Sequence, residues 1–219
     1  MNYIISIINP GALDIMTHIC KELNVPITLS LRGRGTATKS MQNLLGIESK
    51  EKRIVMNTAT EELTASLIRE FKRRLYIDAP GHGIIVSIPI KSIGGGKALS
   101  YFGGGQAKKT TPAINYDYEL ILAITNEGCT DMVMDAARAA GAGGGTVLHA
   151  KGTGAENAEK FFSVSIASEK EIVMIVSKAS EKSAVMRSIL ENAGPSSTAG
   201  TIVFSLPVSE VAGFRLTAE

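Results

Sequence analysis

The chain has 219 residues and a mass of 23.1 kDa; 44% of its residues are hydrophobic, 20% are charged, and its mean hydropathy is +0.14. This composition is typical of a folded protein and excludes a disordered chain. The 23 Lys and Arg nearly balance the 21 Asp and Glu, and aromatic residues make up 5% with no Trp. Nothing therefore favours binding to nucleic acid or to an anionic membrane surface.

The sequence also shows no targeting segment and no set of residues spaced to bind a metal ion. Residues 1–8 lack the basic start of a signal peptide, and no apolar run approaches the roughly 20 residues that cross a bilayer. Cys20 and Cys129 each fall on an expected helix, which argues against a disulfide or a cysteine-based zinc framework. No His, Asp or Glu cluster has metal-ligand spacing. We expect a cytoplasmic protein without membrane insertion and without a metal site.

The first half of the chain predicts two helices among four strands. Asn9 is a suitable N-cap with Pro10 in the first helical turn, and Leu13, Met16, Ile19, Cys20 and Leu23 form the apolar stripe of the first helix. Residues 58–61 supply a capping box for the second helix, whose stripe contains Leu63, Leu67, Ile68 and Phe71. The expected strands, in chain order, cover residues 3–8, 26–31, 53–57 and 84–90.

The second half repeats this order. Residues 9–16 align with 126–133, and 31–36 with 148–153, at an offset of 117; after one inserted residue, 51–56 align with 169–174 and 87–90 with 205–208. The expected strands of this half cover residues 118–124, 146–149, 171–177 and 202–208, and its second helix carries Val185, Met186, Ile189 and Leu190. We interpret 1–93 and 117–219 as two homologous modules, the first and second repeats. They are joined by a Gly-rich linker or loop at 94–116.

Each repeat reads βαββαβ, which predicts an α+β fold of two tandem ferredoxin-like modules with helices on one face of an antiparallel sheet. The strands are apolar enough that the face without helices needs a partner. A homo-oligomer is therefore expected.

Several short motifs resemble the PII signal-transduction family. They are the Ala-Gly helix end and Thr-Val strand of residues 139–149, the Lys-Gly-x-Gly turn of 151–154, its counterpart Arg-Gly-Arg-Gly at 32–35, and the Gly-His-Gly turn at 81–83. In that family the first turn opens the long T-loop and the second is the B-loop. The resemblance implies a trimeric, non-enzymatic sensor for nitrogen regulation. Such a sensor binds ATP or ADP between subunits, in some members with 2-oxoglutarate and magnesium, and adjusts a partner protein through its T-loop.

The chain departs from the family pattern at several positions. The lysine that follows the B-loop glycines is replaced by Ile84 or Thr201, and the glutamine at the T-loop base by Ala37 or Gly154. The loops at 37–52 and 154–170 are shorter than the usual T-loop and contain no tyrosine for uridylylation. Sensing of ATP together with 2-oxoglutarate in the standard way is therefore not expected.

The candidate ligand-binding residues combine glycine turns with cations at the loop bases. Glycine allows a positive φ and a close approach of backbone N–H groups to phosphate or carboxylate, and arginine or lysine can pair with such an anion. His82 lies inside the glycine turn, where it could contact phosphate or titrate near neutral pH. The full set is Arg32, Gly33, Arg34, Gly35, Thr36, Gly81, His82, Gly83, Lys151, Gly152, Thr153, Gly200 and Thr201.

The ordinary alternatives remain open. The glycines could simply make tight turns, Arg32, Arg34 and Lys151 could be solvated loop charges, and Lys72-Arg73-Arg74 is more readily a helix terminus than a binding patch. His18 and both cysteines are expected to pack. The cofactor is unknown, with ATP or ADP suggested by the resemblance, and the regulated partner is not identified. The alternative functions are another ferredoxin-like small-molecule-binding regulatory domain and, less favoured, a small enzyme with the Gly-rich segment as a lid.

Overall fold

The computed structural model describes residues 1–25, 28–38, 50–90, 117–151, 160–161, 164–165 and 169–213, and only the backbone of 151, 160–161 and 164–165. The chain forms two compact units. The first contains residues 1–33, 37–118 and 207–219, and the second contains 34–36 and 119–206. The expected Gly-rich linker at 94–116 and most of both expected loops, 37–52 and 154–170, lie outside the described residues.

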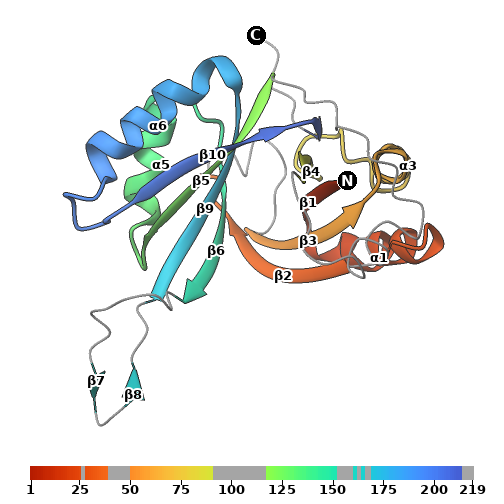
Figure 1. Cartoon of the computed structure of the whole chain (residues 1–219), viewed down its shortest axis with the longest axis horizontal. Helices are drawn as coiled ribbons and strands as arrows, with labels where there is room; N and C mark the ends of the chain where they lie inside the picture. The colour runs from red at the N-terminus through yellow and green to blue at the C-terminus, as the bar shows by residue number, and fades with distance from the viewer. Residues whose placement is uncertain are drawn as a thin grey trace. The chain divides into compact units, whose positions relative to one another are not determined.

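The first unit has the strand order β2-β3-β1-β4-β11 (Figure 1). Strands β3 and β4 flank β1, and both pair with it in antiparallel fashion. The elements are β1 (Asn2–Ile8), the 3₁₀ turn η1 (Pro10–Ala12), α1 (Leu13–Glu22), β2 (Thr28–Gly35), β3 (Glu51–Ala59), α3 (Glu61–Leu75), β4 (Gly83–Pro89) and β11 (Glu210–Ala212).

The second unit has the order β10-β5-β9-β6, followed by the last residues of β2, Arg34 and Gly35, which pair with β6. Its elements are β5 (Tyr118–Asn126), α5 (Thr130–Ala139), β6 (Thr146–Lys151), β9 (Glu169–Lys178), α6 (Ala179–Ala193) and β10 (Ile202–Val208). A small ribbon pairs β7 (Lys160–Phe161) with β8 (Val164–Ser165). In both units the sheet runs fourth, first, third, second strand, so the expected α+β, ferredoxin-like fold is confirmed.

Each unit buries one apolar core between two helices and a sheet face (Figure 1). In the first unit, Met16, Ile19 and Cys20 of α1 meet Leu67, Ile68 and Phe71 of α3. In the second, residues of α5 and α6 pack on β5, β6 and β9. The expected apolar stripes are correct except at Leu190, which is 46% exposed.

The starts of α1 and α3 differ from those expected from the sequence. Asn9 precedes η1 rather than α1, and its side chain does not cap the helix. Thr60 caps α3 by accepting the N–H of Leu63 at 3.3 Å. The expected capping box is therefore wrong, because the cap is two residues later than Thr58 and the third helical residue is leucine.

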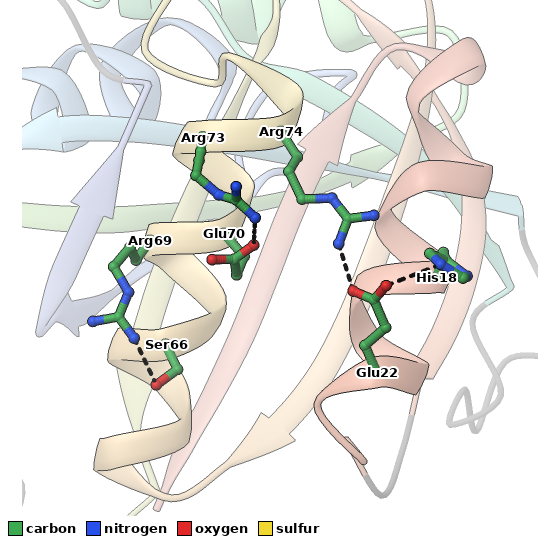
Figure 2. Close-up of polar contacts among 7 residues, drawn as sticks. All are labelled: His18, Glu22, Ser66, Arg69, Glu70, Arg73 and Arg74. Atoms are coloured by element: carbon green, nitrogen blue, oxygen red, sulfur yellow. Dashed lines mark hydrogen bonds and ion pairs between the residues drawn. The ribbon is translucent and has the colours of Figure 1, made fainter.

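The charged end of α3 is a helix terminus with paired side chains (Figure 2). Arg73 binds Glu70, Lys72 lies 3.7 Å from Asp78, and Arg74 binds Glu22 of α1. Glu22 also contacts His18 at 3.0 Å, and the His18 side chain is 65% exposed. His18 is thus a surface residue that joins a charge network, and its expected packing role is wrong.

Candidate functional site

The turn that leads into β4 needs glycine at two positions. Gly81 has a φ of 80° and Gly83 a φ of 148°, both in the region that L side chains rarely adopt. Gly83 pairs with Ile8, and a Cβ at Gly83 would lie 2.3 Å from the carbonyl oxygen of Ile7. Close packing against β1 therefore requires Gly83. Between the two glycines, His82 is exposed, and its Nδ1 lies 3.1 Å from the Leu75 carbonyl oxygen.

Asn9 and Lys52 hold this turn. The amide nitrogen of Asn9 donates to the Gly81 carbonyl oxygen at 3.1 Å, and Lys52 Nζ donates to the Asn9 amide oxygen at 2.5 Å. Lys52 lies near the start of β3, at the end of the expected first loop. Partial burial lowers the pKa of the Lys52 ammonium by desolvation. The first repeat thus places a half-buried cation at the glycine turn.

The second repeat contains the same arrangement. Lys170 Nζ donates to the Asn126 amide oxygen at 2.5 Å, and the Asn126 amide nitrogen donates to the Thr198 carbonyl oxygen at 3.0 Å. The turn continues through Gly200, with a φ of 55°, into β10. We call each set of asparagine, lysine and turn carbonyl a clasp. Its recurrence in both repeats makes chance contact a poor explanation.

Thr201 is committed to the core of the second unit. It is fully buried, donates its hydroxyl to Thr125 Oγ1 at 3.1 Å, and bonds through its backbone to Ala193. The hydroxyl has therefore no free role in the turn, although Gly200 beside it keeps the expected backbone freedom.

The cluster expected at the first loop base has a different structure. Arg32, Gly33, Arg34 and Gly35 lie within strand β2 rather than in a loop, and neither glycine has a positive φ. The expected GxG turn at 33–35 is therefore wrong; the pairing of Arg34 and Gly35 with β6 extends the strand. Arg32 and Arg34 are exposed.

Thr36 anchors the end of this strand. Its hydroxyl donates to the Gly145 carbonyl oxygen at 3.0 Å and accepts the Gly145 N–H at 2.8 Å, while Arg138 donates to its carbonyl oxygen. Residues 34–36 belong to the second unit, whereas Gly81, His82 and Gly83 belong to the first. Thr36 thus has a structural role with its hydrogen-bonding groups already used.

Of the expected residues of the second loop base, only the backbone of Lys151 is described, as the last residue of β6 opposite Glu169. Gly152 and Thr153 lie outside the described residues.

Sequence reasoning missed the asparagine and lysine of each clasp as site residues. The alignment already matched Asn9 with Asn126 and Lys52 with Lys170, so identical polar residues in two otherwise divergent repeats were an available signal.

A buried carboxylate lies beside the second clasp. Glu171 is 3% exposed, accepts the Thr130 hydroxyl at 2.6 Å and the Gly128 N–H at 3.2 Å, and lies 3.8 Å from His149 Nδ1. It supplies the negative charge that the N-terminus of α5 favours. These polar groups satisfy one another, which fits a structural role at the start of α5.

Among the residues that the structure describes, no three His, Cys, Asp or Glu side chains gather in a way that could hold a metal ion. Within the same part of the chain, no helix is long and apolar enough to span a membrane.

Several solved structures are similar to this chain. Arabidopsis thaliana PII bound to citrate is 23% identical, with a TM-score of 0.35, over 43% of this chain and 78% of that one. The B. subtilis GlnK–ATP complex is 15% identical, with a TM-score of 0.34, over 44% and 86%. An unknown protein from Galdieria sulphuraria is 12% identical, with a TM-score of 0.27, over 94% and 98%.

The family comparison is more specific. No curated protein matches the chain, but the family model described as Nitrogen regulatory protein P-II matches residues 118–218. That range includes β5 to β11 and the motif at 139–154 from which the resemblance was inferred. The predicted resemblance is thus confirmed for the second repeat, which resembles the PII family of nitrogen regulatory proteins.

Proposed function

We propose that this chain is a non-enzymatic regulatory protein of the PII type. It binds a small anion, such as an adenine nucleotide, at the turns that precede β4 and β10. The observation that carries the proposal is the match of residues 118–218 to the P-II family model. The protein acts in the cytoplasm as a homo-oligomer, and ligand binding changes the fit of loops 37–52 and 154–170 to a partner protein.

The clasps support an anion as the ligand. A lysine ammonium has three donors, and a half-buried ammonium interacts more strongly with an anion than a fully solvated one does. Asn9 links Lys52 to the turn that contains Gly81 and Gly83, two glycines with positive φ. A phosphate or carboxylate that approaches this turn meets a cation already oriented by Asn9.

The test is a binding screen with the purified full chain. Thermal shift and calorimetry are run against ATP, ADP, AMP, cyclic nucleotides and 2-oxoglutarate, because a ligand at a hundredfold excess over its Kd raises the unfolding free energy by about 2.7 kcal/mol. We expect one adenine nucleotide to bind. No binding by any of these compounds would exclude the nucleotide-sensor form of the proposal.

Variants of the clasp lysines locate the site. If both turns bind ligand, Lys52→Met and Lys170→Met should each weaken its affinity at least tenfold. If only one turn binds ligand, only the variant at that turn should weaken the affinity. Lys72→Met is the matched control, because this lysine lies at the end of α3 and its side chain is 44% exposed. Unchanged affinity in both clasp variants would place the ligand elsewhere on the chain.

A further inference from the structure

The loop between α3 and β4 folds back onto the end of the helix. Helix α3 ends at Leu75, and Tyr76 follows in the left-handed region with a φ of 50°. The Ala79 N–H donates to the Tyr76 carbonyl oxygen at 2.8 Å, and the His82 N–H donates to the Ala79 carbonyl oxygen at 3.2 Å. These two turns bring the imidazole of His82 back to the helix, where its Nδ1 lies 3.1 Å from the Leu75 carbonyl oxygen.

The loop between α6 and β10 makes the same two turns at the repeat offset of 118. The Ser197 N–H donates to the Gly194 carbonyl oxygen at 3.0 Å, and the Gly200 N–H donates to the Ser197 carbonyl oxygen at 3.2 Å. The last helical carbonyl, that of Ala193, accepts the backbone N–H of Thr201 at 3.1 Å. The two loops therefore share a backbone pattern and differ in the group that binds the end of the helix.

The starting points of the strands explain this difference. Strand β4 begins at Gly83, which pairs with Ile8, whereas its counterpart Thr201 precedes β10, which begins at Ile202. Thr201 therefore remains in the loop, and its N–H binds the helix. A helix leaves its last carbonyl groups without intrahelical partners, and a histidine side chain can bind one of them. His82 does so in the first repeat.

This contact fixes the position of a hydrogen on the His82 ring. A carbonyl oxygen only accepts hydrogen bonds, so Nδ1 must carry the hydrogen, and in the neutral ring Nε2 then carries none. His18 is the opposite case, because its Nε2 lies 3.0 Å from a carboxylate oxygen of Glu22 and is the donor atom. The two exposed imidazoles of the first unit should therefore differ in tautomer.

We propose that His82 is a positioning residue, which holds the turn at 81–83 against the end of α3 through its Nδ1–H and does not itself contact the anion. Asn9 binds the Gly81 carbonyl oxygen and His82 binds that of Leu75, so side chains hold the turn at two adjacent residues. The sequence pattern alone suggests instead that His82 contacts phosphate. The part of this inference that concerns the ligand rests on the proposed function, whereas the link between the turn and the helix does not.

Replacement of His82 by the two amide residues distinguishes its ring nitrogens. The amide nitrogen of asparagine is as many bonds from Cβ as Nδ1 of histidine, and that of glutamine as many as Nε2. His82→Asn can therefore keep the donor to Leu75, whereas His82→Gln and His82→Ala should lose it. We expect amide hydrogen exchange in residues 81–84 to become about fivefold faster in the Gln and Ala variants and to stay within about twofold of the original rate in His82→Asn.

His18→Ala is the matched control, because it removes the other exposed imidazole of the first unit and should leave exchange in residues 81–84 unchanged. Exchange in residues 199–202 should be unchanged in every variant, since the second loop is held by its own backbone. Equal exchange in His82→Ala and the original chain would overturn the proposal. Protection by glutamine in place of asparagine would also overturn it, because Nε2 would then be the acting atom.

Nitrogen chemical shifts of the imidazole rings, measured by NMR, test the tautomer without any substitution. At mildly alkaline pH we expect the neutral ring of His82 to carry its hydrogen on Nδ1 and that of His18 to carry it on Nε2. Spectra of His82→Ala and His18→Ala assign the two sets of signals. A His82 ring with its hydrogen on Nε2 would overturn the proposal.

Affinity for ATP, the probe ligand, tests the functional part in a Lys170→Met background, in which the second clasp lacks its cation. His82→Ala and His82→Gln should weaken ATP binding about fivefold, and His82→Asn should restore it. Restoration by glutamine alone would show that His82 contacts the ligand, which would overturn the proposal. If the original chain does not bind ATP, the nucleotide form of the proposed function fails, while the exchange and NMR measurements still confirm or overturn the role of His82.

Discussion

The two repeats share one topology and one clasp but differ in charge at the same position. Glu171 of the second repeat aligns with Arg53 of the first, and Thr130 aligns with Leu13. In the second repeat the buried carboxylate accepts the Gly128 N–H and the Thr130 hydroxyl at the start of α5. In the first repeat, Arg53 binds Glu51 instead. Neither α1 nor α5 has a hydrogen bond from the side chain of its N-cap residue.

This charge difference indicates which repeat would bind an external anion more strongly. The first repeat has Lys52 and Arg53 side by side in sequence, whereas the second follows Lys170 with a carboxylate. Opposite charge nearby reduces the attraction that a lysine exerts on a ligand. If only one clasp binds an anion, we expect it to be the clasp of the first repeat.

The largest expected effect is a difference in stability between variants of the turns that precede β4 and β10. Gly83→Val puts a Cβ 2.3 Å from the Ile7 carbonyl oxygen at a φ of 148°, so the free energy of unfolding should fall by about 3–5 kcal/mol. Its counterpart Thr201→Val keeps the shape and loses one buried hydrogen bond, which costs about 1 kcal/mol. Urea unfolding measures both. Similar losses in the two variants would show that the turns are equivalent. Gly83→Val is thus unsuitable as a probe of ligand binding alone.

Substitution can remove either of the two aligned charges, Glu171 or Arg53. Glu171→Ala leaves the buried Thr130 hydroxyl without its acceptor, so we expect a loss of about 1–3 kcal/mol in the free energy of unfolding. Arg53→Ala removes an exposed contact with Glu51 and should cost less than about 1 kcal/mol. Chemical denaturation measures the free energy of unfolding of both variants. A smaller loss for Glu171→Ala than for Arg53→Ala would contradict a stabilising role of this carboxylate.

The clasps can be compared by double-mutant cycles. Lys52→Met with Asn9→Ala, and Lys170→Met with Asn126→Ala, should each show a coupling of about 1 kcal/mol in the free energy of unfolding. Independent effects of the lysine and the asparagine would mean that the contact contributes nothing.

The pH dependence should distinguish Lys52. Desolvation lowers the pKa of Lys52 in the folded state below its ordinary value of 10.5, so the folded state releases this proton first as the pH rises. Between the two pKa values the unfolded chain holds more protons, and stability therefore increases with pH in that window. Lys52→Met should lack this alkaline increase. A pH profile parallel to that of the original chain would show that the lysine is solvated.

The smallest expected effect concerns the two thiols. Burial raises the pKa of the Cys20 thiol, an effect only partly offset by hydrogen bonds from Thr28 and Asn57, whereas Cys129 is only partly buried. At neutral pH a thiol reagent should therefore modify Cys129 first and Cys20 only on unfolding. Mass spectrometry of the modified protein, with Cys129→Ser as the control, identifies the site. Rapid labelling of Cys20 in the folded chain would contradict the packed core of the first unit.

The sequence predicted the succession of strands and helices along the chain and most of the core, because both follow from local periodicity. The stripe Met16, Ile19 and Cys20 and its counterpart on α3 are buried as expected. The site was harder to predict. Asn9 has the residue type of a helix cap, yet its side chain bonds to Lys52 and Gly81, 43 and 72 residues away in sequence. Gly33 and Gly35 have the residue type of a turn, yet pairing with β6 keeps Gly35 extended. Long-range contacts of this kind outweigh local propensity.

The placement of β11 has a consequence for biosynthesis. The first unit contains residues 1–33 but also residues 207–219, so β11 can pair with β4 only after the second unit has been made. At a chain elongation rate of about 5–20 residues per second, roughly 6–25 s pass between the synthesis of β4 and that of β11. A nascent chain stalled before residue 209 would expose this edge to neighbouring chains and to chaperones. Residues translated after the second unit would therefore complete the sheet of the first unit.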